Sequence, residues 1–405
     1  MVHTCIIRKH IFIMQRIYFN GDHLMGDDGM HYGYNVGLTQ RVISMLRKDT
    51  DKAIVYEQSD TVKLVKWYTD NGYLNPHQIV FVPYTRPDDD HYSSNIILEL
   101  VDLLKSNVVE WEFVIGNVTD PIYYFIQSWI KKYGGNILKD MNFPLKNSLY
   151  NSPKLDVPPN YIENALIPRL RGYWCRDKED LLQAHDNLKS LGITEFVIKP
   201  ISTSSGTGIL FFSDISDMEY YSFQYGDIVL EEKANLREIF PAYHFEGSES
   251  CGELCSQILD GSEFIGVTNL YPIENDVMDA AERTKIELLK TIELQGFWGV
   301  DLLVIGSAVY VNDINTGRIN GSHSPKYIIQ NHYKPNTKFV MRAITTSDSL
   351  DVIASYNPIE LLKGIEPRVF EHIDISKYDC KLIPIIHSSE VESYNCRLLW
   401  VFIEI

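Results

Sequence analysis

The sequence has 405 residues, 45% of them hydrophobic and 22% charged, and its formal net charge at pH 7 is −17. This length favours two or three domains, and the composition supports a folded hydrophobic core. The acidic balance argues against broad binding to nucleic acids or anionic membranes, because such surfaces need many lysines and arginines. It does not exclude a nucleotide, which needs only a few local cations and a metal ion.

No apolar run approaches the roughly 20 residues that span a bilayer, so no membrane partner is expected. Charged residues interrupt the short apolar stretches at the start, so we expect no signal peptide there, and we expect residues 1–13 to precede the fold. Cysteines are scattered, and the CxxxC spacing of Cys251 and Cys255 lacks companion metal ligands. We therefore expect reduced thiols and a cytoplasmic protein.

Short strands alternate with helices over the first part of the chain. Strand-like runs lie at 16–20, 53–56, 79–83 and 112–115, and helical patterns lie at 38–47, 96–104 and 122–133. The alternation predicts an α/β domain with a parallel sheet. The glycines between 26 and 37 lack the G-x-G-x-x-G spacing of a dinucleotide site, so we expect a loop at the carboxyl edge of the sheet, where substrates tend to bind.

A polar, proline-containing passage at 142–159 separates this domain from the next. The stretch 177–191 (DKEDLLQAHDNLKSL) then predicts an amphipathic helix. Asp177 is the expected N-cap, Asp180 takes the reciprocal position of a capping box, and Gly192 follows the end of the helix.

A lysine, Lys199, lies near the end of the apolar strand expected at 195–200 (EFVIKP). A serine- and glycine-rich loop follows, and then a second strand is expected at 209–212. Hydroxyl and backbone N–H groups of such a loop can cradle phosphate oxygens while the lysine supplies positive charge. The order differs from a P-loop, and a hairpin turn with a lysine on an edge strand is the alternative. The candidate loop residues are Ser204, Ser205, Gly206 and Gly208.

The next strand, expected at 227–232 (DIVLEE), ends in two acids, Glu231 and Glu232. Exposed backbone after such a strand can bind adenine through one carbonyl and one N–H group. A carboxylate several residues later can hold the ribose hydroxyls. A pair of solvated glutamates beside the start of a helix is the alternative.

Two further strands are expected at 298–305 (WGVDLLVI) and 309–315 (VYVNDIN), paired as a hairpin. Asp313 and Asn315 are two apart on one strand and therefore point to the same face. Their hard oxygen atoms suit magnesium bridging nucleotide phosphates. Acids inside an apolar hairpin are costly unless a cation compensates them, which favours the functional interpretation.

Asp301 joins these ligands only in one register of the hairpin. A two-residue turn would pair Asp301 with Asn312, whereas a three-residue loop would pair Asp301 with Asp313. We therefore predict the longer, bulged loop at residues 306–308.

Taken in chain order, the motifs VIKP, the Ser/Gly loop, LEEKA, GVDLLV and VNDINTGR resemble the ATP-grasp superfamily over roughly residues 150–330. The resemblance implies an α/β (α+β ATP-grasp) fold: a Rossmann-like pre-ATP-grasp domain at 14–145, a flap lobe at about 150–230, a catalytic lobe at about 231–335 and a C-terminal α/β segment at 336–405. The flap and catalytic lobes together form an ATP-grasp domain at 150–335.

In that family two magnesium ions lie between a carboxylate on one strand and a D/E-x-N pair on the next. The resemblance assigns Asp301, Asp313 and Asn315 to these metal positions and Lys199 to the phosphates. Asp313 replaces the more usual glutamate and remains a competent ligand. Arg318 resembles the arginine that stabilises the transferring phosphoryl group, although it follows Asn315 by three residues rather than two.

The resemblance also assigns residues to the binding of adenine and ribose. Glu231 and Glu238 are seven apart, as are the adenine and ribose acids of D-alanine ligase-like members, and Glu232 is an alternative for the first. The backbone of Glu232 and Ala234 would contact adenine. Lys154 stands about 45 residues before Lys199, at the distance of a second family lysine, in surroundings that match poorly.

The resemblance implies an ADP-forming carboxylate–amine ligase that uses ATP and magnesium, with a small-molecule carboxylate and an amine such as an amino acid or peptide as substrates. Segment 315–325 (NTGRINGSHSP) and the tail resemble pheganomycin-type peptide ligases. An ATP-grasp kinase of a small hydroxylated substrate and a non-catalytic ATP-binding protein are the alternatives. The sequence leaves the oligomeric state open.

Overall fold

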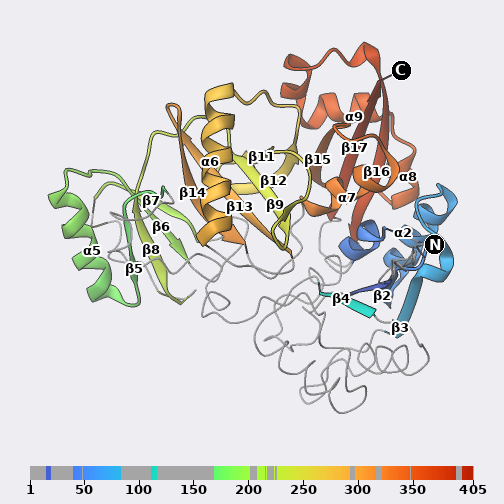
Figure 1. The fold of residues 1–405 in the computed structure, drawn as a ribbon, viewed down its shortest axis with the longest axis horizontal. Coiled ribbons are helices and arrows are strands. Elements are labelled where there is room, and N and C mark those ends of the chain that lie inside the picture. The colour runs from blue at the N-terminus through green and yellow to red at the C-terminus, as the bar shows by residue number, and fades with distance from the viewer. Residues whose placement is uncertain are drawn as a thin grey trace, which may run out of the picture.

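The computed structural model describes residues 15–19, 40–47, 49–83, 111–115, 168–200, 208–214, 216, 223, 226–291, 297–315, 322–346, 348–388 and 395–404. Their strands form three sheets (Figure 1), one of four strands near the N-terminus, a second of four strands and a third of nine. None of the helices in these ranges is long and apolar enough to cross a membrane.

The N-terminal sheet has the order β3-β2-β1-β4, and all its described pairs are parallel. Its strands are β1 (Gln15–Phe19), β2 (Lys52–Glu57), β3 (Ile79–Pro83) and β4 (Trp111–Ile115). The parallel sheet predicted from the alternating pattern is therefore confirmed. The helix expected at 38–47 is the 3-10 helix η2 (Gln40–Met45), and the Gly-rich loop and the expected helices at 96–104 and 122–133 lie outside the described residues.

The helix α2 (Ser59–Asp70) was not predicted. Its buried residues follow the helical spacing of one apolar stripe, and the short η3 (Pro76–Gln78) comes before β3. Polar and charged residues between the apolar positions hide this stripe in the sequence. The apolar residues of the stripe are Leu64, Val65 and Tyr68, and the polar residues Asp60 and Thr61 are buried beside them.

The second sheet has the order β5-β8-β6-β7 and is antiparallel. Its strands are β5 (Gly172–Cys175), β6 (Phe196–Pro200), β7 (Leu210–Phe212) and β8 (Ile228–Glu232). Helix α5 (Lys178–Ser190) covers one face, where Leu181 and Leu188 join the core of Phe196, Ile198 and Leu230. In Figure 1 this small sheet and α5 lie at one end of the molecule.

The predicted N-cap of α5 is confirmed, since Asp177 accepts hydrogen bonds from the backbone N–H groups of Glu179 and Asp180 at 3.0 and 2.9 Å. The capping box differs by one residue. Asp180 accepts from the backbone of Arg176 at 3.1 Å rather than from that of Asp177. The aspartate arm is shorter than the usual glutamate, and the guanidinium of Arg176 also donates to it.

The large sheet has nine antiparallel strands in the order β14-β13-β9-β11-β12-β15-β17-β16, with β10 beside β9. Its strands are β9 (Pro241–Glu246), β10 (Glu249–Ser250), β11 (Cys255–Asp260), β12 (Glu263–Thr268), β13 (Phe297–Ile305), β14 (Ala308–Asn315), β15 (Lys338–Thr345), β16 (Tyr378–Ser388) and β17 (Asn395–Glu404). The last three strands come from the C-terminal segment, which therefore extends the same sheet.

The two faces of this sheet have different covers. Helix α6 (Asn275–Thr291) packs on the face of Trp298 and Val300. Helix α7 (His323–His332) packs on the opposite face, where Tyr327 contacts Phe297. The smaller elements α8 (Leu350–Ala354), α9 (Pro358–Ile365), η8 (Pro367–Glu371) and η9 (Ile375–Lys377) follow in the C-terminal segment.

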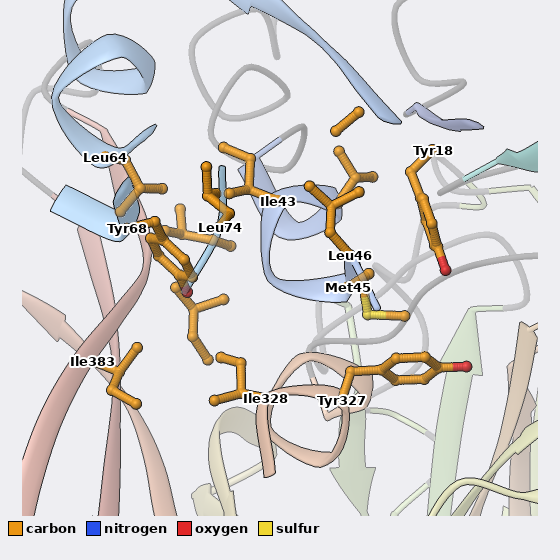
Figure 2. Packing of buried hydrophobic residues seen from close by; sticks show 14 of the residues in the cluster. Tyr18, Ile43, Met45, Leu46, Leu64, Tyr68, Leu74, Tyr327, Ile328 and Ile383 are labelled. Atoms are coloured by element: carbon orange, nitrogen blue, oxygen red, sulfur yellow. The ribbon is translucent and has the colours of Figure 1, made fainter. Parts of the chain in front are cut away.

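An apolar core joins the N-terminal sheet to the large sheet. Figure 2 shows Tyr18, Ile43 and Met45 facing Tyr327 and Ile328 of α7. A polar clamp adds to this core, since the buried amide of Gln40 accepts from the backbone N–H of His387 and donates to its carbonyl, both at 2.7 Å. Apolar burial of this kind resists separation, so α7 holds a fixed place between the two sheets.

Candidate functional site

The hairpin of β13 and β14 differs from the prediction in its turn. Ile305 pairs with Ala308, so the turn contains only Gly306 and Ser307, and the three-residue loop is wrong. Gly306 has a φ of 60°, which a two-residue hairpin turn requires and glycine adopts without strain. Asp301 nevertheless pairs with Asp313.

A β-bulge restores this pairing. The register shifts between Leu302, which pairs with Val311, and Asp301, which pairs with Asp313. Asn312 is therefore the extra residue of β14, left opposite no residue of its own. Because of the bulge, the Asp313 side chain lies on the same face of the hairpin as Asp301. Without the bulge, the two-residue turn would place it on the opposite face.

Three oxygen-bearing side chains meet on the face opposite α6. Asp301 accepts from the Gln257 amide at 2.6 Å through one carboxylate oxygen and from the Asn315 amide at 2.9 Å through the other. Asp313 is the direct neighbour of Asp301 across the pair, and Asn315 is buried. Asp301 is thus the centre of a preorganised polar group on an otherwise apolar hairpin.

The donor set fits magnesium by its chemistry. Within the described ranges no group of three or more histidine, cysteine, aspartate or glutamate residues is placed to hold a metal. Magnesium, however, is usually bound by one or two carboxylates together with substrate phosphates and water. Asp301 and Asp313 supply two carboxylates, and the Asn315 amide nitrogen donates to Asp301 at 2.9 Å.

Lys199 reaches from the small sheet to this hairpin. Its ammonium donates to the carboxylate of Glu231, and also to the side-chain oxygen of Asn312 at 2.7 Å. Only 12% of the lysine side chain and 9% of the glutamate side chain are exposed. Strand β6 lies between β8 and β7, so the alternative of a lysine on an edge strand is wrong.

The two glutamates at the end of β8 have different partners. Glu231 is buried and faces Lys199, whereas Glu232 accepts from the Arg171 guanidinium at 3.0 and 2.6 Å. The backbone N–H of Glu232 donates to the Arg171 carbonyl at 2.9 Å. The glutamates are therefore ion-paired rather than simply solvated. Further along, Ala234 is half-buried and Glu238 is exposed.

Several candidate residues stay outside this geometry. Gly208 is described, with a φ of 77°, two residues before β7 begins at Leu210. Lys154, Ser204, Ser205, Gly206 and Arg318 lie outside the described residues.

Sequence reasoning missed three residues of the site: Gln257, Asn312 and His244. Gln257 and His244 lie on strands β11 and β9, which were not predicted. Asn312 was weighed only as a possible partner of Asp301.

His244 lies beside the acidic group, because it pairs with Gly299, which in turn pairs with Asn315. Its side chain is buried and its ring centroid is 5.0 Å from that of His323. Its Nδ1 has no hydrogen-bond partner among the described residues. Burial holds the pKa of His244 well below its ordinary value, and the charges of Lys326 and His323 act in the same direction.

No known family model and no curated protein matches the sequence. Solved structures share its fold over almost the whole chain. An N5-carboxyaminoimidazole ribonucleotide synthetase with ADP is 13% identical, with a TM-score of 0.58 over 97% of this chain and 92% of that chain. The Staphylococcus aureus N5-carboxyaminoimidazole synthetase with ADP is 14% identical, with a TM-score of 0.55 over 97% and 94%.

A phosphoribosylamine–glycine ligase from Thermotoga maritima is 11% identical, with a TM-score of 0.52 over 97% of this chain and 93% of that chain. Such low identities establish the fold alone. The chain has the ATP-grasp fold, with a small antiparallel sheet of four strands and a large one of nine.

The buried pair of Lys199 and Glu231 predicts a double-mutant cycle. Lys199→Met or Glu231→Leu alone leaves one buried charge without its partner and should lower the free energy of unfolding by about 3 kcal/mol. The double variant should lose clearly less than the sum. Urea unfolding measures all three, with the exposed Lys233 as control, where Lys233→Met should stay within about 1 kcal/mol of wild type. Additive losses for Lys199 and Glu231 would contradict the pairing.

His244 predicts a pH dependence of stability. Its pKa is lowered in the folded state, so below an unfolded value of about 6.5 the unfolded chain binds a proton that the folded chain resists. The free energy of unfolding should therefore fall as the pH drops from 7.5 to 5, by up to about 1.4 kcal/mol per pH unit from this residue. His244→Phe should flatten that slope in urea titrations. Equal slopes for wild type and His244→Phe would be the contrary result.

Proposed function

We propose that the protein is an ATP-dependent, ADP-forming carboxylate–amine ligase that makes an amide or peptide bond through an acyl-phosphate. The observation that carries this proposal is the meeting of Lys199, from the small sheet, with the strand that bears Asp313 and Asn315. A cation on one side and hard oxygen ligands on the other suit a metal-bound triphosphate between them.

The nucleotide contacts divide between the lobes. Lys199 binds a phosphate, and the loop of Ser204, Ser205, Gly206 and Gly208 covers the phosphates. The carbonyl of Glu232 and the N–H of Ala234 bind adenine, because the N–H of Glu232 already donates to Arg171. Glu238 holds the ribose. Two of the similar structures contain ADP, which supports the use of a nucleotide.

Asp301, Asp313 and Asn315 would hold magnesium, two ions by family resemblance. Bound there, the metal neutralises charge on the phosphates and orients them. Lys154 is the second lysine candidate, and Arg318 is the residue proposed to stabilise charge at the reacting centre.

The reaction runs in two steps. A carboxylate oxygen of the first substrate attacks the γ-phosphorus of ATP, the bond to the bridging oxygen breaks, and ADP leaves. The amine nitrogen of the second substrate then attacks the acyl carbon, the bond to the phosphate oxygen breaks, and inorganic phosphate leaves while the amine proton is lost. The chain contributes positioning and charge, and no side-chain nucleophile is needed.

The substrates proposed are small molecules with a carboxylate and an amine, such as amino acids or short peptides. A kinase of a small hydroxylated substrate is the second candidate. Strongly anionic alcohols such as inositol phosphates need a dense basic pocket, and two of the described cations near the site, Lys199 and Arg171, are each paired with a glutamate. A screen with ATP, magnesium, amino acids and short peptides, followed by mass analysis, separates an amide, a phosphorylated alcohol and no product.

The proposed domains are the pre-ATP-grasp domain at 14–145, the ATP-grasp domain at 150–335 and the C-terminal segment at 336–405. Support for the first boundary comes from strands β1 to β4, which form a sheet of their own, whereas strands β15 to β17 of the C-terminal segment belong to the same sheet as β9 to β14.

Asp313→Ala tests the metal assignment. It removes one carboxylate from the polar group and should lower ADP-forming turnover by more than about 100-fold. Circular dichroism and thermal unfolding should show that the fold is kept. Asp279→Ala, on the exposed surface of α6, serves as the matched control and should keep full activity. Activity of Asp313→Ala near the wild-type level would refute the assignment.

A further inference from the structure

The bulge on β14 connects the two sheets as well as correcting the register. Asn312, its extra residue, accepts a hydrogen bond from the Lys199 ammonium at 2.7 Å. The preceding residue, Val311, donates its backbone N–H to the carbonyl of Pro168 at 2.8 Å, and Pro168 lies just before the small sheet begins. A bulge commonly re-aims a side chain away from its own ladder, and here it aims one at the opposite sheet.

We propose that Asn312 is a positioning residue, which sets the phosphate-binding Lys199 relative to the metal-binding Asp313. This inference rests on the proposed nucleotide site. Asn312 and Asp313 are consecutive on one strand, so a contact from Lys199 to the first fixes its distance from the second. Asn312 touches neither phosphate nor metal in this role and acts through the lysine.

Glu231 cannot do the same work. Lys199 and Glu231 both belong to the small sheet, on the adjacent strands β6 and β8, so their ion pair orients the lysine only within that sheet. The hydrogen bond to Asn312, on β14, fixes the position of the ammonium relative to the large sheet. The two acceptors therefore have separate effects: the carboxylate compensates the buried charge, and the amide sets where that charge lies.

The chemistry of the lysine leaves room for a ligand. An ammonium group has three N–H donors. Among the described residues, Glu231 and Asn312 accept two of them, and the third can be donated to a phosphate oxygen. Since Asn312 is neutral, it positions the lysine without cancelling the charge that a phosphate requires.

A carboxylate at this position would have the opposite effect. Asn312→Asp keeps an acceptor of the same size, but adds a negative charge beside Asp313 and a second anion for Lys199. Asn312→Ala removes the acceptor and leaves the pair with Glu231 intact. Comparing the two variants therefore separates the effect of the lysine's position on nucleotide binding from the effect of its charge.

Calorimetric titration of the full-length chain with ATP, with and without magnesium, tests the proposal without knowledge of the substrates. Asn312→Ala should weaken binding of ATP with magnesium about tenfold and reduce the gain in affinity that magnesium provides, because lysine and metal ligands are no longer held in register. Asn312→Asp should weaken binding further. Asn331→Ala is the matched control, a half-buried asparagine bonded to the Leu46 carbonyl away from the site, and should bind like wild type.

The results distinguish this inference from the proposed function. If wild type binds ATP and Asn312→Ala shows the same affinity and the same magnesium effect, Asn312 is not a positioning residue and the nucleotide site stands. If wild type itself does not bind ATP, the proposed function falls and this inference falls with it. A thermal midpoint of Asn312→Ala close to wild type, together with reduced affinity, separates positioning from loss of folding.

Discussion

The buried ammonium of Lys199 is the constraint on which the site depends. A buried charge needs a compensating anion, which Glu231 supplies from the same sheet. It also needs its remaining donors satisfied, and the bulged Asn312 supplies one acceptor from the other sheet. The small sheet is thus held to the hairpin that carries Asp301 and Asp313 by a group whose positive charge is available to a phosphate. Packing, register and the proposed chemistry meet at this single side chain.

The large sheet and its helices supply the rigid support for that contact. Helix α6 fills one face, so the acids of the hairpin can project only from the other. On that other face α7 packs against the N-terminal sheet through the apolar core that contains Tyr18 and Tyr327. Gln257 and Asn315 then orient the Asp301 carboxylate through hydrogen bonds at 2.6 and 2.9 Å. Such supporting bonds hold ligands in the geometry that a metal and a nucleotide require.

Local patterns allowed much of this to be predicted. The strands around Lys199 and Asp313 are short apolar runs bounded by turn residues, and Asp177 carries a local capping signal. The bulge escaped prediction because it depends on how two strands pair, so the tight turn at Gly306 appeared incompatible with the pairing of Asp301 and Asp313. Asn312 and Gln257 were likewise assigned no role, since their partners are 113 and 44 residues away in the chain.

The most direct measurement of the central claim is a crystal structure with ADP and magnesium. The account predicts a phosphate oxygen within hydrogen-bond distance of the Lys199 ammonium. It also predicts magnesium at about 2.1 Å from side-chain oxygens of the group Asp301, Asp313 and Asn315. A nucleotide bound elsewhere, or bound here with Lys199 and these acids free of contact to phosphate and metal, would contradict it.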